Sequence, residues 1–221
     1  DTDKFIEGLI VFIGDTLGIL KEYVTARDKV LVITDENVKE LYFASLGKYL
    51  PESFVYTLSK EAEKAKNVET YASVVNFALD NYLDRNITVI AFGGGAVGDF
   101  AGFFASTYKR GVKFINIPTT LLAHDSSIGG KTALNFGAVK NVVGTFYQPD
   151  VVVYHTDFLK SLSKKEILSG FGEIIKHDLL SDAYLLHNIL DENTRLEHYV
   201  FDANLIEDIL HRSMLVKKLY I

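Results

Sequence analysis

Short apolar runs alternate with segments of helical periodicity over most of the chain, and this alternation limits the possible folds more than any other feature. Residues 29–34 form a continuous apolar run, which is typical of a strand covered on both faces. Residues 36–50 then place apolar side chains on one side of a helix, which Pro51 ends. This alternation predicts a mostly parallel sheet layered with helices.

The same patterns predict the remaining elements. The predicted strands are residues 53–58, 87–92, 113–117 and 151–154, and the predicted helices are residues 68–83, 97–108, 163–180, 182–191 and 202–220. Because no strand pattern follows the last of these strands, we predict an α/β domain with a boundary near residues 155–160. A helical domain should follow it.

Composition excludes several classes of function. The net charge of −6 argues against general nucleic-acid binding, and the lack of cysteine excludes thiolate metal sites. The apolar N-terminal run at residues 5–20 is broken by Glu7, Asp15 and three glycines, so we predict neither a transmembrane span nor a signal peptide. We therefore expect a cytoplasmic protein without nucleic-acid or membrane partners.

A glycine-rich turn follows the predicted strand at residues 87–92. Gly93, Gly95 and Gly98 match the spacing G-x-G-x-x-G, in which backbone N–H groups and a helix N-terminus can hold a pyrophosphate. A tight turn without a ligand is the alternative. The acidic residue usual about 20 positions further on is absent, since Pro118 and threonines stand there.

Asp35 is the better acidic candidate, because it ends the predicted strand at residues 29–34. A carboxylate at that place can bind the hydroxyl groups of a ribose. Alternatively, Asp35 is only the N-cap of the following helix, which would be the more common role for such a residue.

Four cations could hold a phosphate-bearing substrate: Arg110, Lys131, Lys140 and Lys176. The alternative for each is a solvated surface charge. The three lysines stand among glycines or beside asparagine or glutamate, at the expected carboxyl edge of the sheet, where open α/β folds bind ligands.

Glu173 and Lys176 lie three residues apart on a predicted helix and therefore share a face. They form either a weak surface ion pair or a metal-binding carboxylate beside a substrate-binding ammonium. The six histidines show no H-E-x-x-H or similar spacing, and only His124, next to Asp125, is a candidate for a role in the site.

Six motifs occur in a fixed order: Gly-Gly-Gly-x-x-Gly-Asp, Pro-Thr-Thr, Asp-Ser-Ser-x-Gly-Gly-Lys, Asn135-x4-Lys140-Asn141, Tyr-Gln-Pro and Glu-Ile-Ile-Lys. In this combination the chain resembles the 3-dehydroquinate synthases of the sugar-phosphate cyclase family, from about residue 29 to the C-terminus. The resemblance implies an α/β fold with a Rossmann-like, mostly parallel sheet domain at residues 1–157. The first part of an α-helical metal and substrate domain would follow at residues 158–221.

The resemblance also implies NAD as a cofactor. Its expected contacts are Asp35, Glu61, Lys64, Gly94, Gly95, Asp99, Thr119, Thr120, Lys131, Lys140, Phe158, Leu159, Lys160 and Ser161. Glu61 and Lys64 match the family's Gly-Glu-x-x-Lys loop, although Lys60 stands at the glycine position. Ser161 replaces a threonine and Gly172 an alanine.

The implied reaction is a carbon–oxygen lyase reaction of the shikimate pathway, in which 3-deoxy-D-arabino-heptulosonate 7-phosphate loses phosphate and closes to 3-dehydroquinate. NAD takes and returns a hydride, while a divalent metal, zinc or cobalt, polarises the reacting oxygens. The expected catalytic and substrate residues are Arg110, Asp125, Lys131, Asn141, Lys176 and Lys217, and Glu173 is the expected metal ligand. Family membership alone also suggests a homodimer.

The family's two other metal ligands are histidines that follow the position of Lys217, whereas this sequence ends at Ile221. We therefore expect a truncated chain that is inactive alone. The alternatives are another sugar-phosphate cyclase, an iron- or zinc-dependent polyol dehydrogenase, and an inactive cofactor-binding module.

Overall fold

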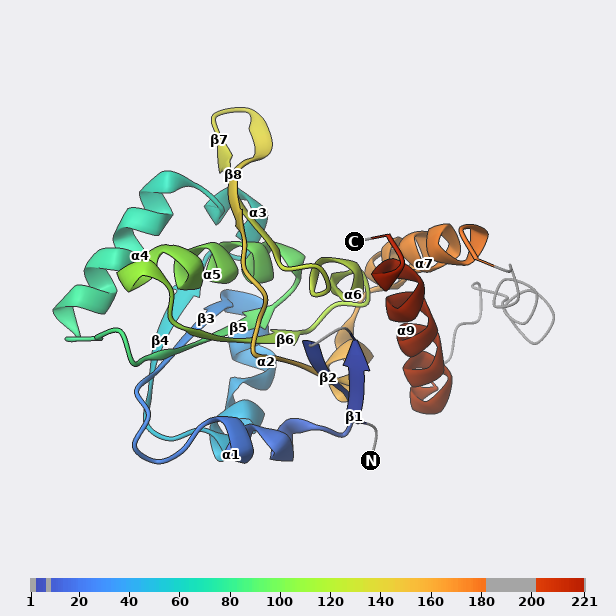
Figure 1. The fold of residues 1–221 in the computed structure, drawn as a ribbon, viewed down its shortest axis with the longest axis horizontal. Helices are drawn as coiled ribbons and strands as arrows, with labels where there is room; N and C mark the ends of the chain where they lie inside the picture. The colour runs from blue at the N-terminus through green and yellow to red at the C-terminus, as the bar shows by residue number, and fades with distance from the viewer. Residues whose placement is uncertain (1–2, 7–8, 182–201, 221) are drawn as a thin grey trace.

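A seven-stranded sheet organises the molecule (Figure 1), and the computed structural model describes residues 3–6, 9–181 and 202–220. The strand order is β1-β2-β9-β6-β5-β3-β4, and only the β1–β2 pairing is antiparallel. The strands are β1 (Asp3–Ile6), β2 (Leu9–Gly14), β3 (Val30–Asp35), β4 (Ser53–Leu58), β5 (Thr88–Gly93), β6 (Lys113–Pro118) and β9 (Val151–His155). The predicted mostly parallel α/β fold is confirmed.

Helices cover both faces of the sheet, so its central strands are buried throughout. On one face, α4 (Val68–Asp80) and α5 (Gly95–Thr107) pack against Leu31 and Val89. On the other face, Val32 and Ile90 pack with residues of a second set of helical segments. These segments are α1 (Leu20–Tyr23), α2 (Glu36–Leu46) and the 3-10 helices η1 (Leu17–Ile19), η2 (Gly47–Tyr49) and η4 (Thr156–Ser161). Two-sided burial explains why these strands are continuous apolar runs.

The strand order reverses between β3 and β5. From β3 the chain crosses to β4 on one side, and then returns through α3 (Ala62–Ala65) and α4 to β5 on the other side. The connections that leave the carboxyl ends of β3 and β5 therefore run in opposite directions. Such a switch point opens a crevice at the carboxyl edge of a parallel sheet, and here it lies between Asp35 and Gly93.

Two long helices, α7 (Lys164–Leu179) and α9 (Ala203–Lys218), pack on the β2–β9 part of the sheet. Ile174 and Ile209 are buried there with Val11 and Val152. Ser163 begins α7 with a capping box that includes Glu166. The predicted helices at residues 163–180 and 202–220 are thus confirmed, while the one at 182–191 lies outside the described residues. The domain division at residue 157 remains a prediction.

Several elements differ from the sequence prediction. The β7–β8 hairpin (Lys131–Phe136 and Val139–Phe146) stands above α5 in Figure 1. No strand was predicted there, because lysine, asparagine and glycine interrupt the apolar pattern. Helix α5 begins at Gly95, two residues earlier than predicted, so the glycine segment forms its first turn. Within the described residues, none of the helices has the length and apolar character needed to cross a bilayer.

Candidate functional site

The glycine turn joins β5 to α5 at the carboxyl edge of the sheet. A Cβ on Gly93 would lie 2.6 Å from the Val97 side chain, so this glycine is required by packing. Gly94 is the N-cap of α5 and, lacking a side chain, leaves the first turn of the helix without a side-chain hydrogen bond. A helix N-terminus of this kind offers N–H groups and a positive partial charge to an anion.

Two threonines border this turn from the end of β6. The N–H group of Thr119 donates to the carbonyl oxygen of Gly93 at 2.9 Å, which joins the loop after β6 to the end of β5. The Thr119 hydroxyl is buried and has no hydrogen-bond partner among the described residues. A buried hydroxyl without a partner is energetically costly, so this oxygen is suited to contact a ligand at the turn.

Asp35 lies on the other side of the switch point and caps α2. Its carboxylate accepts a hydrogen bond from the N–H group of Val38 at 3.0 Å, so Asp35 is the N-cap of this helix. Burial raises the pKa of the Asp35 carboxyl above its ordinary value, although hydrogen bonds from the backbone of Val38 and Asn37 oppose this effect. The predicted contact of Asp35 with a ribose remains a prediction.

Lys66 is the most deeply buried charged residue at this edge, with 2 % of its surface exposed. Its ammonium group donates to Asp99 at 2.8 Å and to the side-chain oxygen of Asn141 at 2.5 Å. Burial raises the pKa of Asp99, and the contact with Lys66 only partly opposes this effect. Asp99 and Asn141 also line a cavity of about 270 Å³ together with Lys131, Thr132, Ala133, Gly144, Thr145 and Phe146.

Lys66 was missed by the sequence analysis, although its signal was present. The predicted pair, Glu61 and Lys64, forms an exposed ion pair whose side chains are 66 % and 77 % exposed. The same Glu-x-x-Lys spacing recurs two residues later at Glu63 and Lys66, and Lys66 contacts the cavity residues Asp99 and Asn141. Glu63 also accepts from Asn135 at 3.0 Å and pairs with Lys140 at 3.5 Å. The cofactor role assigned to Glu61 and Lys64 remains a prediction.

A second group of charged residues lies where α6 (Ala123–Ser126), α7 and α9 meet. This polar cluster consists of Asp125, Glu173, Lys176, His177 and Lys217. Asp125 accepts from Lys217 at 2.8 Å and lies 4.0 Å from Lys176, which also pairs with Glu173. Burial raises the pKa of Asp125, but Lys217 and Lys176 outweigh this effect and hold the pKa below its ordinary value. The hydrogen bond with Glu173 raises the pKa of Lys176.

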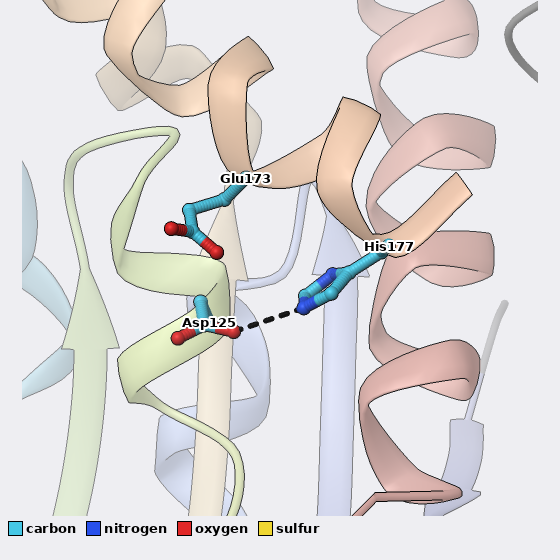
Figure 2. A group of neighbouring side chains, drawn as sticks. All are labelled: Asp125, Glu173 and His177. Atoms are coloured by element: carbon cyan, nitrogen blue, oxygen red, sulfur yellow. Dashed lines mark ion pairs between the residues drawn. The ribbon is translucent and has the colours of Figure 1, made fainter. Parts of the chain in front are cut away.

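His177 completes the cluster (Figure 2), although it was not among the residues predicted for the site. Its Nε2 atom lies 3.0 Å from an Asp125 oxygen, and ligand atoms of Asp125, Glu173 and His177 all lie within 4.8 Å of one another. Burial lowers the pKa of His177, which favours the neutral ring that binds metal ions. The available signal was its spacing of four residues from Glu173 on one helix face.

Four other residues predicted for the site lie outside the polar cluster in the described part of the chain: Arg110, Phe158, Leu159 and Lys160. Arg110 lies in η3 (Tyr108–Arg110) after the end of α5, so the length of that helix separates it from the glycine turn by roughly 20 Å. Phe158 and Leu159 are buried, and the Phe158 ring contacts Phe92 with a centroid distance of 5.2 Å. Lys160 pairs with Asp157 at 2.6 Å. The functional roles assigned to these residues remain predictions.

Comparison with protein families gives a match to the family model of the 3-dehydroquinate synthase N-terminal domain over residues 56–169. A 3-dehydroquinate synthase from Bacillus cytotoxicus is 43 % identical over 199 residues, which cover 87 % of this chain and 52 % of that protein. One from Listeria monocytogenes is 46 % identical over 167 residues, covering 75 % and 46 % of the two chains. The chain thus spans about half the length of the curated relatives it matches.

Solved structures give the same fold. The 2-epi-5-epi-valiolone synthase from Streptomyces hygroscopicus subsp. jinggangensis 5008, solved with NAD+ and Zn2+ bound, superposes with a TM-score of 0.82 at 28 % identity and covers 98 % of this chain and 61 % of that one. An iron-containing alcohol dehydrogenase superposes with a TM-score of 0.71 at 17 % identity, covering 99 % and 68 % of the chains. The latter identity supports a shared fold only.

Proposed function

This chain belongs to the 3-dehydroquinate synthase family, and we propose that it supplies the NAD-binding part and one side of the metal and substrate site of such an enzyme. The reaction would convert 3-deoxy-D-arabino-heptulosonate 7-phosphate to 3-dehydroquinate with elimination of phosphate. The observation that carries the proposal is the polar cluster, in which Asp125, Glu173 and Lys217 approach one another from three helices.

The carboxyl edge of the sheet fits NAD. The uncapped N-terminus of α5 is suited to a pyrophosphate, because its first-turn N–H groups have no side-chain acceptor. A Cβ on Gly95 would meet the Ser126 oxygen at 3.1 Å, so a glycine there keeps the backbone accessible. The buried Thr119 hydroxyl would supply a further polar contact. Bound NAD supplies a hydride acceptor, while these residues bind and orient it.

The polar cluster fits a divalent cation. Two carboxylates and one imidazole nitrogen form a donor set that zinc or cobalt accepts. Glu173 would be one ligand of the ion, which acts as a Lewis acid when bound. The ammonium groups of Lys176 and Lys217 lie beside these carboxylates, where they would bind the phosphate and carboxylate of the sugar acid.

Two measurements on the chain test the proposal. Calorimetric titration with NAD comes first, because cofactor binding does not depend on turnover; no binding would contradict the cofactor site. Phosphate release from the seven-carbon sugar acid, with NAD and Co2+ present, would then support the synthase activity. NAD binding without phosphate release would instead support an inactive cofactor-binding chain. Accumulation of NADH with glycerol would overturn the assignment in favour of a polyol dehydrogenase.

Replacing Thr119 with valine should separate cofactor binding from stability. We expect NAD affinity to fall about tenfold, since one hydrogen bond is lost. We expect the unliganded chain to be as stable as the parent or more stable by about 1 kcal/mol, because a buried hydroxyl without a partner is removed. Titration calorimetry and urea unfolding measure the two effects.

The control is Thr88→Val, which changes a buried threonine at the opposite end of β5 from the glycine turn. It should leave NAD affinity unchanged. If Thr119→Val lowered stability and left NAD affinity at the parent value, the hydroxyl would have only a structural role.

A further inference from the structure

Tyr154 is one of the largest side chains of the core with none of its surface exposed, and it lies near the carboxyl end of β9. Its neighbours in the core are apolar and include Leu121 and Val152. The three residues before it on the strand are valines, so an apolar side chain would suit the packing at this place. A tyrosine adds a hydroxyl group, which needs a hydrogen-bond partner when it is buried.

The Tyr154 hydroxyl has its partners in the loop between β6 and α6. It donates to the carbonyl oxygen of Thr120, and the carbonyl oxygen of Leu121 lies 3.3 Å from it. The direction of these contacts is fixed, because a carbonyl oxygen can only accept a hydrogen bond. The contacts span 34 and 33 residues. They therefore join β9 to a loop that leaves the neighbouring strand of the sheet.

The same loop carries Thr119, whose buried hydroxyl has no hydrogen-bond partner among the described residues. The Thr119 N–H group donates to the Gly93 carbonyl oxygen at 2.9 Å, so the loop is attached to the glycine turn at this residue. One residue later it is attached to Tyr154 through the Thr120 carbonyl. The Thr120 side chain lies close to the turn as well, since a Cβ on Gly94 would be 3.2 Å from its methyl group.

We propose that Tyr154 is a positioning residue for the cofactor, whose hydroxyl holds the loop at residues 119–122 so that Thr119 Oγ1 stays at the glycine turn. Tyr154 would act through Thr119 and would not touch the ligand itself. A polar group that is already held in place binds a ligand more tightly, because it need not be ordered on binding. The proposal rests on the NAD site of the proposed function.

The test is Tyr154→Phe, which keeps the ring and removes only the hydroxyl, so the fold should persist. We expect NAD affinity, measured by titration calorimetry, to fall about three- to tenfold, the effect of one hydrogen bond. Exchange of the Thr119 amide hydrogen, followed by NMR on the 15N-labelled chain, should become about tenfold faster, because the loop opens more often.

Tyr108→Phe is the matched control. Tyr108 is buried, and its hydroxyl donates to the carbonyl oxygen of Leu83 at 2.6 Å. It follows the end of α5, roughly 20 Å from the glycine turn. This variant loses the same kind of hydrogen bond, yet its NAD affinity and Thr119 exchange should equal those of the parent. Equal effects of the Tyr154 and Tyr108 substitutions on both measurements would give Tyr154 a structural role only and overturn the proposal.

The route through Thr119 is tested in a Thr119→Val background. There Tyr154→Phe should change NAD affinity by less than about twofold, because the hydroxyl that it positions is absent. An undiminished loss in that background would contradict action through Thr119 and overturn the proposal.

The amide measurement separates this proposal from the cofactor site. If the parent chain bound no NAD, the cofactor site would be wrong, and exchange at Thr119 would decide the role of Tyr154. Faster exchange in Tyr154→Phe, but not in Tyr108→Phe, would support the positioning of Thr119. Unchanged exchange in Tyr154→Phe would overturn it.

Discussion

Replacing Lys66 with methionine should lower the free energy of unfolding by about 3 kcal/mol. Methionine fills a similar volume but removes the ammonium group that pairs with Asp99 at 2.8 Å. The Asp99 carboxylate, of which 19 % is exposed, is then left without its cation. Loss of one partner of a buried pair typically costs 3–5 kcal/mol, and the remaining exposure of Asp99 favours the lower end of that range.

The loss of unfolding free energy in Lys66→Met should depend on pH in a defined direction. Burial already raises the pKa of Asp99 in the folded chain, and removal of Lys66 raises it further. A carboxyl group whose pKa is higher in the folded than in the unfolded chain destabilises the fold as pH rises. The stability difference between Lys66→Met and the parent should therefore shrink as the pH falls from neutrality through the raised pKa of Asp99. Urea unfolding at several pH values measures it.

Lys64→Met is the matched control, since Lys64 is a lysine of the neighbouring turn with a 77 % exposed side chain. We expect it to change stability by less than about 0.5 kcal/mol. The double variant Lys66→Met with Asp99→Asn should lose less free energy of unfolding than Lys66→Met alone, because it leaves no unpaired charge. Equal effects of the Lys64 and Lys66 substitutions would contradict the buried pair.

The parts of the site that sequence patterns predicted are those fixed by local geometry. Asp35 follows a continuous apolar strand, and a residue at that place must lie at the carboxyl edge of the sheet. Glu173 and Lys176 share a helix face because of their spacing. For the same reasons the mostly parallel sheet follows from the sequence, since two-sided burial requires the apolar runs.

The parts that were missed depend on contacts between distant segments. Lys66 differs from the neighbouring exposed lysines only through Asp99 and Asn141, which lie 33 and 75 residues away. His177 belongs to the cluster because Asp125 comes within 3.0 Å of it, and a search for pairs of histidines could not reveal that. Strands β7 and β8 lack a continuous apolar run, and they are stabilised mainly by pairing with each other and by contact with α5.

Gly170→Ala should destabilise the chain and weaken the polar cluster. A Cβ at this position would lie 2.6 Å from the side chain of Leu121, which is fully buried, so α7 and the Leu121 segment must move apart. Overpacking of this kind typically costs about 1–3 kcal/mol. Because Leu121 precedes Asp125 and Gly170 lies one turn before Glu173, the movement separates the two carboxylates. We expect weaker Co2+ binding together with a lower urea midpoint.

Gly172→Ala provides the control on the same helix, since no atom of the described neighbouring elements lies within 4 Å of a Cβ there. Alanine restores helix propensity without a clash, so this variant should be more stable than the parent by up to about 1 kcal/mol. Its Co2+ affinity should equal that of the parent. The two glycines, two residues apart on α7, thus predict stability changes of opposite sign. If both substitutions stabilised the chain, the close approach of α7 to Leu121 would be wrong, and with it the geometry that brings Glu173 to Asp125.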